Sequence, residues 1–135
     1  MTAGYSGTPL AKKLSLKAGQ RAWFEGMPAS VRSEIDPEAA GLVVLAAPER
    51  PIDAAHVFVT ERAKLDEAIA RLLPLLAPTG HLWVSWPKKA SKVPTDITED
   101  VIRDVALPTG LVDVKVCAVD ETWSGLKLMI RKENR

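Results

Sequence analysis

LVDVKVCAVDETWSGLKLMI, residues 111–130, is the stretch that decides the fold. Residues 111–119 form an apolar segment, and Leu126, Leu128 and Ile130 alternate with polar side chains as the residues of a half-buried strand do. The loop between the two segments is too short for the crossover that parallel strands require. The stretch therefore predicts an antiparallel hairpin. The side chains expected on one face of its first strand are Val112, Val114, Val116 and Ala118.

Upstream of the hairpin, short apolar segments alternate with amphipathic ones. The predicted strands cover residues 21–24, 41–46, 55–59 and 81–86. The predicted helices cover residues 9–16, 29–35 and 61–73, and a last one begins after Thr95 or Thr98 and ends at Gly110. Alternation of this kind is typical of a parallel sheet with right-handed crossovers.

Local signals suggest where these elements begin and end. Thr8 and Thr60 are expected to cap the first and third helices, with Pro9 at the first helical position. The uninterrupted apolar run at residues 41–46 favours a strand that is buried on both faces. Pro74 must end or kink the third helix, whose apolar stripe is the longest of the chain.

Length and composition limit the range of answers. The 135 residues, 47% hydrophobic and 26% charged, suit one globular domain over residues 9–135, preceded by a flexible tail at residues 1–8. A net charge of +1 lacks the broad basic field that nucleic-acid binding requires. Cys117 is the only cysteine, which excludes an internal disulfide and a zinc site of several thiolates. With no signal peptide and no long apolar run, we expect a cytoplasmic protein without a membrane contact.

An α/β chain that ends in a strand, a helix and an antiparallel hairpin resembles the class I methyltransferase fold over roughly residues 10–132. The segments WVSWPKK (residues 83–89) and VCAVDETWSGL (residues 116–126), with LKAGQR (residues 16–21), also resemble a group of small bacterial proteins of unknown function. The resemblance implies a three-layer, Rossmann-like α/β fold with a mostly parallel six-stranded sheet. With strands numbered along the chain, the implied order is 2-1-3-4-6-5, and one strand-helix unit of the usual methyltransferase sheet is missing.

The sequence departs from that family at the cofactor loop. Methyltransferases follow the first strand with an acidic residue and a Gly-x-Gly turn, because glycine lets the backbone approach S-adenosylmethionine. Here Glu25 and Gly26 match, but Met27 and Pro28 replace the permissive turn, and proline lacks an N–H donor. Only Glu49 stands where an acid would hold the ribose hydroxyls. We therefore expect no cofactor, and S-adenosylmethionine is the disfavoured exception.

Ligands of parallel α/β sheets bind beyond the carboxyl ends of the strands, and this rule selects three loops. The candidate rim that they form comprises Glu25, Gly26, Trp86, Lys88, Lys89, Asp120, Glu121, Trp123 and Ser124. Tryptophan walls with a few charges are typical of a small-molecule pocket, and the lysines predict a small anionic ligand. The competing interpretation is that the tryptophans close the end of the core while the charges pair across the rim.

Other candidates are weaker. His56 and His81 each begin a predicted strand, so we expect both to be solvated at the amino edge of the sheet. They do not predict a metal site, because no cluster of acidic residues accompanies them. Ser85 lacks the glycine elbow of a hydrolase nucleophile, and Cys117 is expected to be a small buried hydrophobe.

Three functions remain open from the sequence. The first is a non-catalytic or small-ligand-binding module on a degenerate methyltransferase-like fold. The second is a minimal S-adenosylmethionine-dependent methyltransferase, or another small enzyme that acts on an anionic metabolite. The third is an interaction protein that forms a homodimer through a sheet edge or the leucine-rich helix. Whether the protein is an enzyme is not decided by the sequence.

Overall fold

The computed structural model describes residues 8–135, so most of the tail predicted at residues 1–8 lies outside the described part. The strands are β1 (Arg21–Glu25), β2 (Val43–Val44), β3 (Ile52–Phe58), β4 (Leu76–Pro87), β5 (Leu111–Ala118) and β6 (Trp123–Ile130). The α-helices are α1 (Leu10–Lys13), α2 (Ala29–Ile35), α3 (Arg62–Leu72) and α4 (Glu99–Ala106). Short 3₁₀ turns cover Leu73–Leu75, Lys89–Ser91, Leu107–Thr109 and Lys132–Asn134.

The six strands form one sheet in the order β2-β1-β3-β4-β6-β5, as the resemblance implied. β1 pairs in parallel with β2 and β3, and β3 pairs in parallel with β4. β6 is antiparallel to both β4 and β5, which confirms the predicted hairpin. Only residues 119–122 join the two hairpin strands, and so short a connection allows no parallel crossover.

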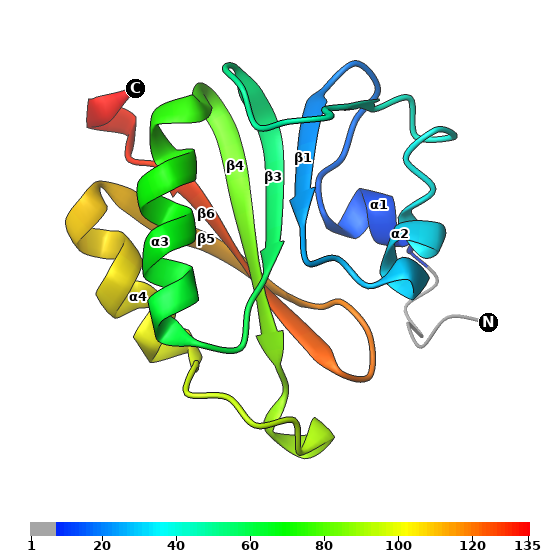
Figure 1. Ribbon diagram of the computed structural model, residues 1–135. Helices are drawn as coiled ribbons and strands as arrows, with labels where there is room; N and C mark the ends of the chain where they lie inside the picture. The colour runs from blue at the N-terminus through cyan, green and yellow to red at the C-terminus, as the bar shows by residue number, and fades with distance from the viewer. Residues whose placement is uncertain (1–7) are drawn as a thin grey trace.

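Two apolar clusters hold the helices against opposite faces of the sheet. Leu82, Val84 and Trp86 of β4 belong to the cluster that includes the buried side chains of α3 and α4. Trp83, between them in the strand, belongs to the cluster of α1 and α2. Figure 1 shows α3 and α4 on one side of the sheet and α1 and α2 on the other. These three layers confirm the predicted Rossmann-like α/β class. None of the described helices is long and apolar enough to cross a membrane.

The second strand differs from its prediction. The run at residues 41–46 was expected to be a buried strand, but β2 contains only Val43 and Val44, and Val43 is 48% exposed. β2 is the outermost strand on this side and pairs only with β1, so it has no second neighbour to bury it. Apolar runs alone do not distinguish an edge strand from a central one.

Two of the predicted helix caps are wrong. α1 begins at Leu10 with Pro9 at the cap position, and it ends at Lys13 rather than at residue 16. α3 begins at Arg62 after Glu61, not after Thr60. Instead, the Asp96 side chain accepts a hydrogen bond from the Arg62 N–H at 2.7 Å. A cap supplied by a distant loop leaves no local signal in the sequence.

The last helix is capped as predicted, but the fifth strand is not regular. The Thr98 hydroxyl accepts a hydrogen bond from the Val101 N–H at 3.2 Å. In β5, the register with β6 shifts between Asp113 and Lys115, so Val114 is an extra, bulged residue. The bulge reverses the alternation, and Val112 and Val116 therefore lie on opposite faces of the sheet rather than on one.

Both histidines are buried, contrary to the prediction that they are solvated at the amino edge. β3 and β4 begin earlier than expected, at Ile52 and Leu76, which places the histidines inside the sheet. His56 is 2% exposed and His81 is 4% exposed. His56 Nε2 lies 2.7 Å from the Ser85 hydroxyl, and its ring stacks on Phe58. Burial lowers the pKa of His56 to about 3 and that of His81 to about 4.

Candidate functional site

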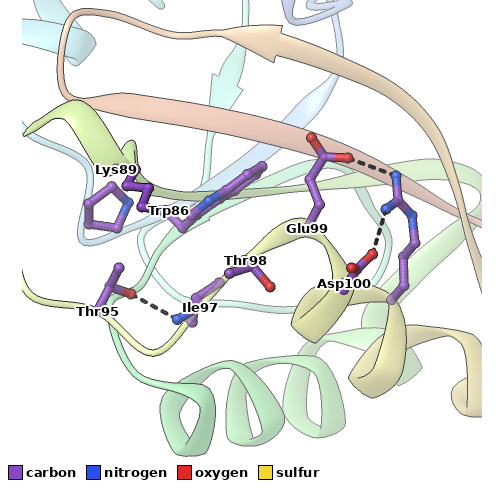
Figure 2. A pocket seen from close by; sticks show the side chains of 9 residues that line it. Trp86, Lys89, Thr95, Ile97, Thr98, Glu99 and Asp100 are labelled. Atoms are coloured by element: carbon purple, nitrogen blue, oxygen red, sulfur yellow. Dashed lines mark hydrogen bonds and ion pairs between the residues drawn. The ribbon is translucent and has the colours of Figure 1, made fainter.

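A hollow of about 560 Å³ opens beside Trp86, at the carboxyl end of β4, and is called the Trp86 pocket below. Its lining residues are Trp86, Pro87, Lys89, Thr95, Ile97, Thr98, Glu99, Asp100 and Arg103. Figure 2 shows the Trp86 indole between the loop that carries Lys89 and the first turn of α4, which carries Glu99. A volume of this size is in the range of small-molecule sites.

The loop below Trp86 is held by its own hydrogen bonds. The Thr95 hydroxyl donates to the backbone oxygen of Thr60 at 2.7 Å. It also accepts from the Ile97 N–H at 3.0 Å (Figure 2). The Ile97 side chain is buried in the same apolar cluster as Trp86. Since Thr98 then caps α4, this wall of the pocket is fixed before any ligand binds.

The charges around the pocket are unequally paired. The Arg103 guanidinium bonds Glu99 at 2.8 Å, Asp100 at 3.3 Å and Asp113 at 3.1 Å. The hydrogen bonds from Asp113 and Glu99 raise the pKa of Arg103. Lys89, by contrast, has no carboxylate within 4.0 Å in the described part of the chain. Its ammonium is the cation of the pocket that is free to meet a ligand.

The loop at residues 25–28, the Glu25 loop below, is arranged differently. Both carboxylate oxygens of Glu25 are bonded by the Arg71 guanidinium, at 2.5 and 2.9 Å. The indole N–H of Trp23 donates to the same carboxylate at 2.6 Å. The hydrogen bond from Arg71 lowers the pKa of Glu25, which stays ionised at neutral pH.

Gly26 has a structural reason of its own to be glycine. Its φ is +67°, and a Cβ built there would lie 2.9 Å from the backbone oxygen of Phe58. Because glycine has no Cβ, the end of β1 approaches the end of β3 more closely at Gly26 than any other residue type would allow. Met27 then packs into the cluster of Phe58 and Trp123, whose rings meet edge to face with centroids 5.1 Å apart. A smaller hollow of about 280 Å³ remains between this loop and α3.

The structure divides the candidate rim among several places. Trp86 and Lys89 line the Trp86 pocket, whereas Glu25 and Gly26 line the smaller hollow. Trp86 and Trp123 belong to the two different apolar clusters, on opposite faces of the sheet. These two tryptophans are therefore not the two walls of one cavity.

The remaining rim residues shape the turn between β5 and β6. The Asp120 carboxylate accepts the N–H groups of Thr122 and Trp123, both at 2.8 Å. The Lys88 N–H donates to the backbone oxygen of Thr122 at 2.7 Å. Ser124 lies opposite Trp86 in the sheet, and Glu121 is exposed. Within residues 8–135, no three potential ligands are placed to hold a metal ion.

The sequence reasoning missed the wall that α4 supplies. The predicted candidate rim extends only to Lys89 in the loop after β4 and does not include Thr98, Glu99 or Arg103. The available signal was the capping threonine. A helix that begins directly after the loop of a parallel strand begins at the same rim of the sheet, and its first turn faces the loop.

No family model matches the sequence, and no curated protein matches it. Among solved structures, the chain is similar to an S-adenosylmethionine-dependent methyltransferase from Aquifex aeolicus, with a TM-score of 0.63 and 18% identity over 90% of this chain and 87% of that one. It is also similar to magnesium protoporphyrin IX methyltransferase from Synechocystis, solved with bound S-adenosylmethionine, with a TM-score of 0.58 and 10% identity over 90% and 74% of the two chains. A third is ribosomal protein L11 methylase from Lactobacillus delbrueckii, with a TM-score of 0.56 and 10% identity over 90% and 75%. At these identities the likeness establishes the class I methyltransferase fold.

Proposed function

We propose that this protein is a small-ligand-binding module that has the methyltransferase fold without a working cofactor site. One contrast supports the proposal. The Trp86 pocket is open, has an aromatic wall and carries an unpaired Lys89 ammonium. In the Glu25 loop, the Glu25 carboxylate is bonded to Arg71 and Trp23, and Gly26 lies against the backbone of Phe58.

The geometry of the Glu25 loop disfavours S-adenosylmethionine. A carboxylate that serves a cofactor needs free acceptor sites, and Arg71 and Trp23 already make three hydrogen bonds to Glu25 out of about four that a carboxylate accepts. Gly26 is used for contact with Phe58, and Pro28 offers no N–H. A ligand that required both oxygens of Glu25 would have to displace the Arg71 guanidinium.

The lining of the Trp86 pocket suggests the chemistry of its ligand. Trp86, which is 8% exposed, provides a small apolar contact for a planar ring, and Lys89 provides one unpaired positive charge. The Thr95 and Thr98 hydroxyls lie at the same wall. The proposed ligand is therefore a planar molecule with one carboxylate or a similar acidic group, and this keeps the anionic ligand expected from the sequence.

Titration with benzoate, indole-3-acetate and their uncharged amides tests this proposal, with binding measured by calorimetry and by tryptophan fluorescence. We expect the carboxylates to bind more tightly than the amides. Lys89→Met should remove that preference. Lys88→Met is the matched control, because Lys88 is the adjacent lysine and does not line the pocket. Equal binding of acids and amides to the wild-type protein would sink the assignment of Lys89.

A minimal methyltransferase is the second candidate function. The observation in its favour is the shared fold, since the Synechocystis enzyme was solved with S-adenosylmethionine bound. Its test is calorimetry with S-adenosylmethionine. Micromolar binding that Glu25→Gln abolishes would favour the enzyme over the module. The third candidate, a homodimer, predicts a mass of two chains in light scattering at micromolar concentration.

A further inference from the structure

Among the described residues, no lysine takes part in a salt bridge. Each salt bridge within 4.0 Å uses an arginine: Arg21, Arg71 or Arg103. The lysines therefore keep their charge available to a partner. Since the net charge of the whole chain is only +1, any place where lysines gather without acids is a local excess.

Four lysines gather where the end of α1 meets the hairpin: Lys13, Lys17, Lys115 and Lys127, called the lysine cluster below. Lys115 Nζ donates to the backbone oxygen of Lys13 at 3.1 Å. Lys127 Nζ donates to the Ser15 hydroxyl at 3.0 Å. Burial lowers the pKa of Lys127, and the charges of Lys115 and Lys17 lower it further. The charges that lower the pKa of Lys127 are thus those of other lysines.

The same place is a free edge of the sheet. β5 is the outermost strand on this side and pairs only with β6. Val114 is 49% exposed and Val116 is 48% exposed, which is unusual for valine in a strand. The bulge at Val114 ends the regular edge on one side, and this leaves Lys115–Ala118 as the regular segment available for pairing.

Side chains alternate along that segment. Lys115 lies opposite Lys127, on the face that α1 covers. Val116 lies opposite Leu126, on the face of the α3 and α4 cluster. A strand added to this edge would therefore place alternate side chains against a positive face and against an apolar face.

We propose that the outer edge of β5 binds an extended acidic segment of another protein, with acidic side chains on the lysine cluster and apolar ones on Val116. Backbone hydrogen bonds to the edge supply affinity in this mode, and the alternating side chains supply specificity. Charge complementarity selects the acidic partner.

A second copy of this chain fits the edge less well. Two β5 strands that pair antiparallel about a two-fold axis perpendicular to the sheet keep the same face on the same side. The lysine clusters of both copies would then lie side by side across the junction. Like charges at such short range oppose association, whereas an acidic segment meets the same surface with attraction.

A six-residue peptide of alternating glutamate and valine, with blocked ends, is the probe for the test. We expect saturable binding by calorimetry, slower amide hydrogen exchange at residues 115–118, and weaker binding at higher salt. Lys17→Glu should lower the affinity about tenfold, because it reverses one exposed charge of the cluster. Lys115→Glu should lower it further, and its melting temperature is measured in parallel because Lys115 also bonds α1.

Two controls make the result decisive. Lys64→Glu, on α3 at the opposite layer, should leave the affinity unchanged. A peptide of the same composition with its glutamates and valines in separate blocks should bind at least several-fold more weakly, because it lacks the alternation. Three results would overturn the proposal: equal binding of both peptides, no binding of either, or equal loss in the Lys64 variant. Preferential binding of a single-stranded oligonucleotide, or dimerisation through β5, would overturn it as well.

Discussion

The Trp86 pocket and the Glu25 loop lie at the same rim of the sheet, yet they are built in opposite ways. At the Glu25 loop, the acid, the glycine and the methionine each contact another part of the protein. At the Trp86 pocket, the aromatic wall faces an open hollow, and Lys89 has no acidic partner among residues 8–135. The difference teaches that the motif nearest to the methyltransferase pattern is used for packing here, while the proposed binding pocket lies two strands away in the sheet.

The largest expected effect comes from Gly26→Ala. Its φ of +67° and its Cβ 2.9 Å from the Phe58 oxygen should together cost about 3 kcal/mol of unfolding free energy. Gly19→Ala is the matched control, because its φ is +87° but nothing lies within 4 Å of its Cβ. That variant should lose only about 1 kcal/mol. Urea denaturation measures both, and equal losses would show that the Glu25 loop is not closed by packing.

The two buried histidines should make the protein sensitive to acid. Burial lowers the pKa of His56 to about 3 and of His81 to about 4, against 6.5 in the unfolded chain. Because the unfolded chain then binds protons first, stability is fully present above pH 6.5 and is lost as the pH falls toward 4 and below. Each histidine should contribute a slope of up to about 1.4 kcal/mol per pH unit in that range.

The two histidines should differ when they are replaced. Within the described residues His81 Nε2 has no hydrogen-bond partner, so His81→Leu should keep or raise the stability at pH 7 and reduce the loss at pH 5. His56→Leu removes the partner of the buried Ser85 hydroxyl and should cost about 1–3 kcal/mol at pH 7. Urea denaturation at both pH values decides this. A stability that does not change between pH 7 and pH 5 in the wild type would contradict the burial of both rings.

Helix capping should matter at one rim threonine and not at the other. Thr98→Ala removes the hydrogen bond to the Val101 N–H and should cost about 1 kcal/mol. Thr60→Ala, at the cap position that the sequence predicted, should cost less than about 0.5 kcal/mol, because α3 begins after Glu61. Thermal unfolding of the pair measures the difference, and the reverse order would contradict the described start of α3.

The smallest effect is expected for the ion pair between Glu25 and Arg71, which holds the Glu25 loop. Glu25→Gln should cost about 1 kcal/mol or less at pH 7, since Arg71 is 40% exposed. The pKa of Glu25 is lowered by Arg71, so this contribution is present above the unfolded pKa of 4.5 and is lost as the pH falls below it. A double-mutant cycle with Arg71→Met isolates the pair, and a coupling near zero would mean that the pair does not hold the loop.

Much of the fold could be predicted, because its signals are local. The short turn at residues 119–122 dictates the hairpin, and the strand-helix alternation dictates the parallel half of the sheet. The length of β2 could not be predicted, because it depends on the position of β2 at the edge of the sheet, where only β1 pairs with it. The cap of α3 comes from Asp96, far along the chain.

The site was predicted only in part, for a similar reason. Trp86 and Lys89 follow from the rule that ligands bind at the carboxyl ends of strands. The rule does not say which face a side chain takes, so it grouped Trp86 with Trp123 although the two pack on opposite faces. The burial of His56 depends on where β3 begins, and strand ends are the least certain part of a sequence-based prediction.

The most direct test of the contrast between the two regions is one calorimetric competition on the wild-type protein. The protein is titrated with S-adenosylmethionine, then with indole-3-acetate, and finally with indole-3-acetate in the presence of saturating S-adenosylmethionine. The account predicts saturable binding of indole-3-acetate, no heat from S-adenosylmethionine, and no competition between them. Micromolar binding of S-adenosylmethionine that is lost in Glu25→Gln, with no binding of the carboxylate, would contradict it.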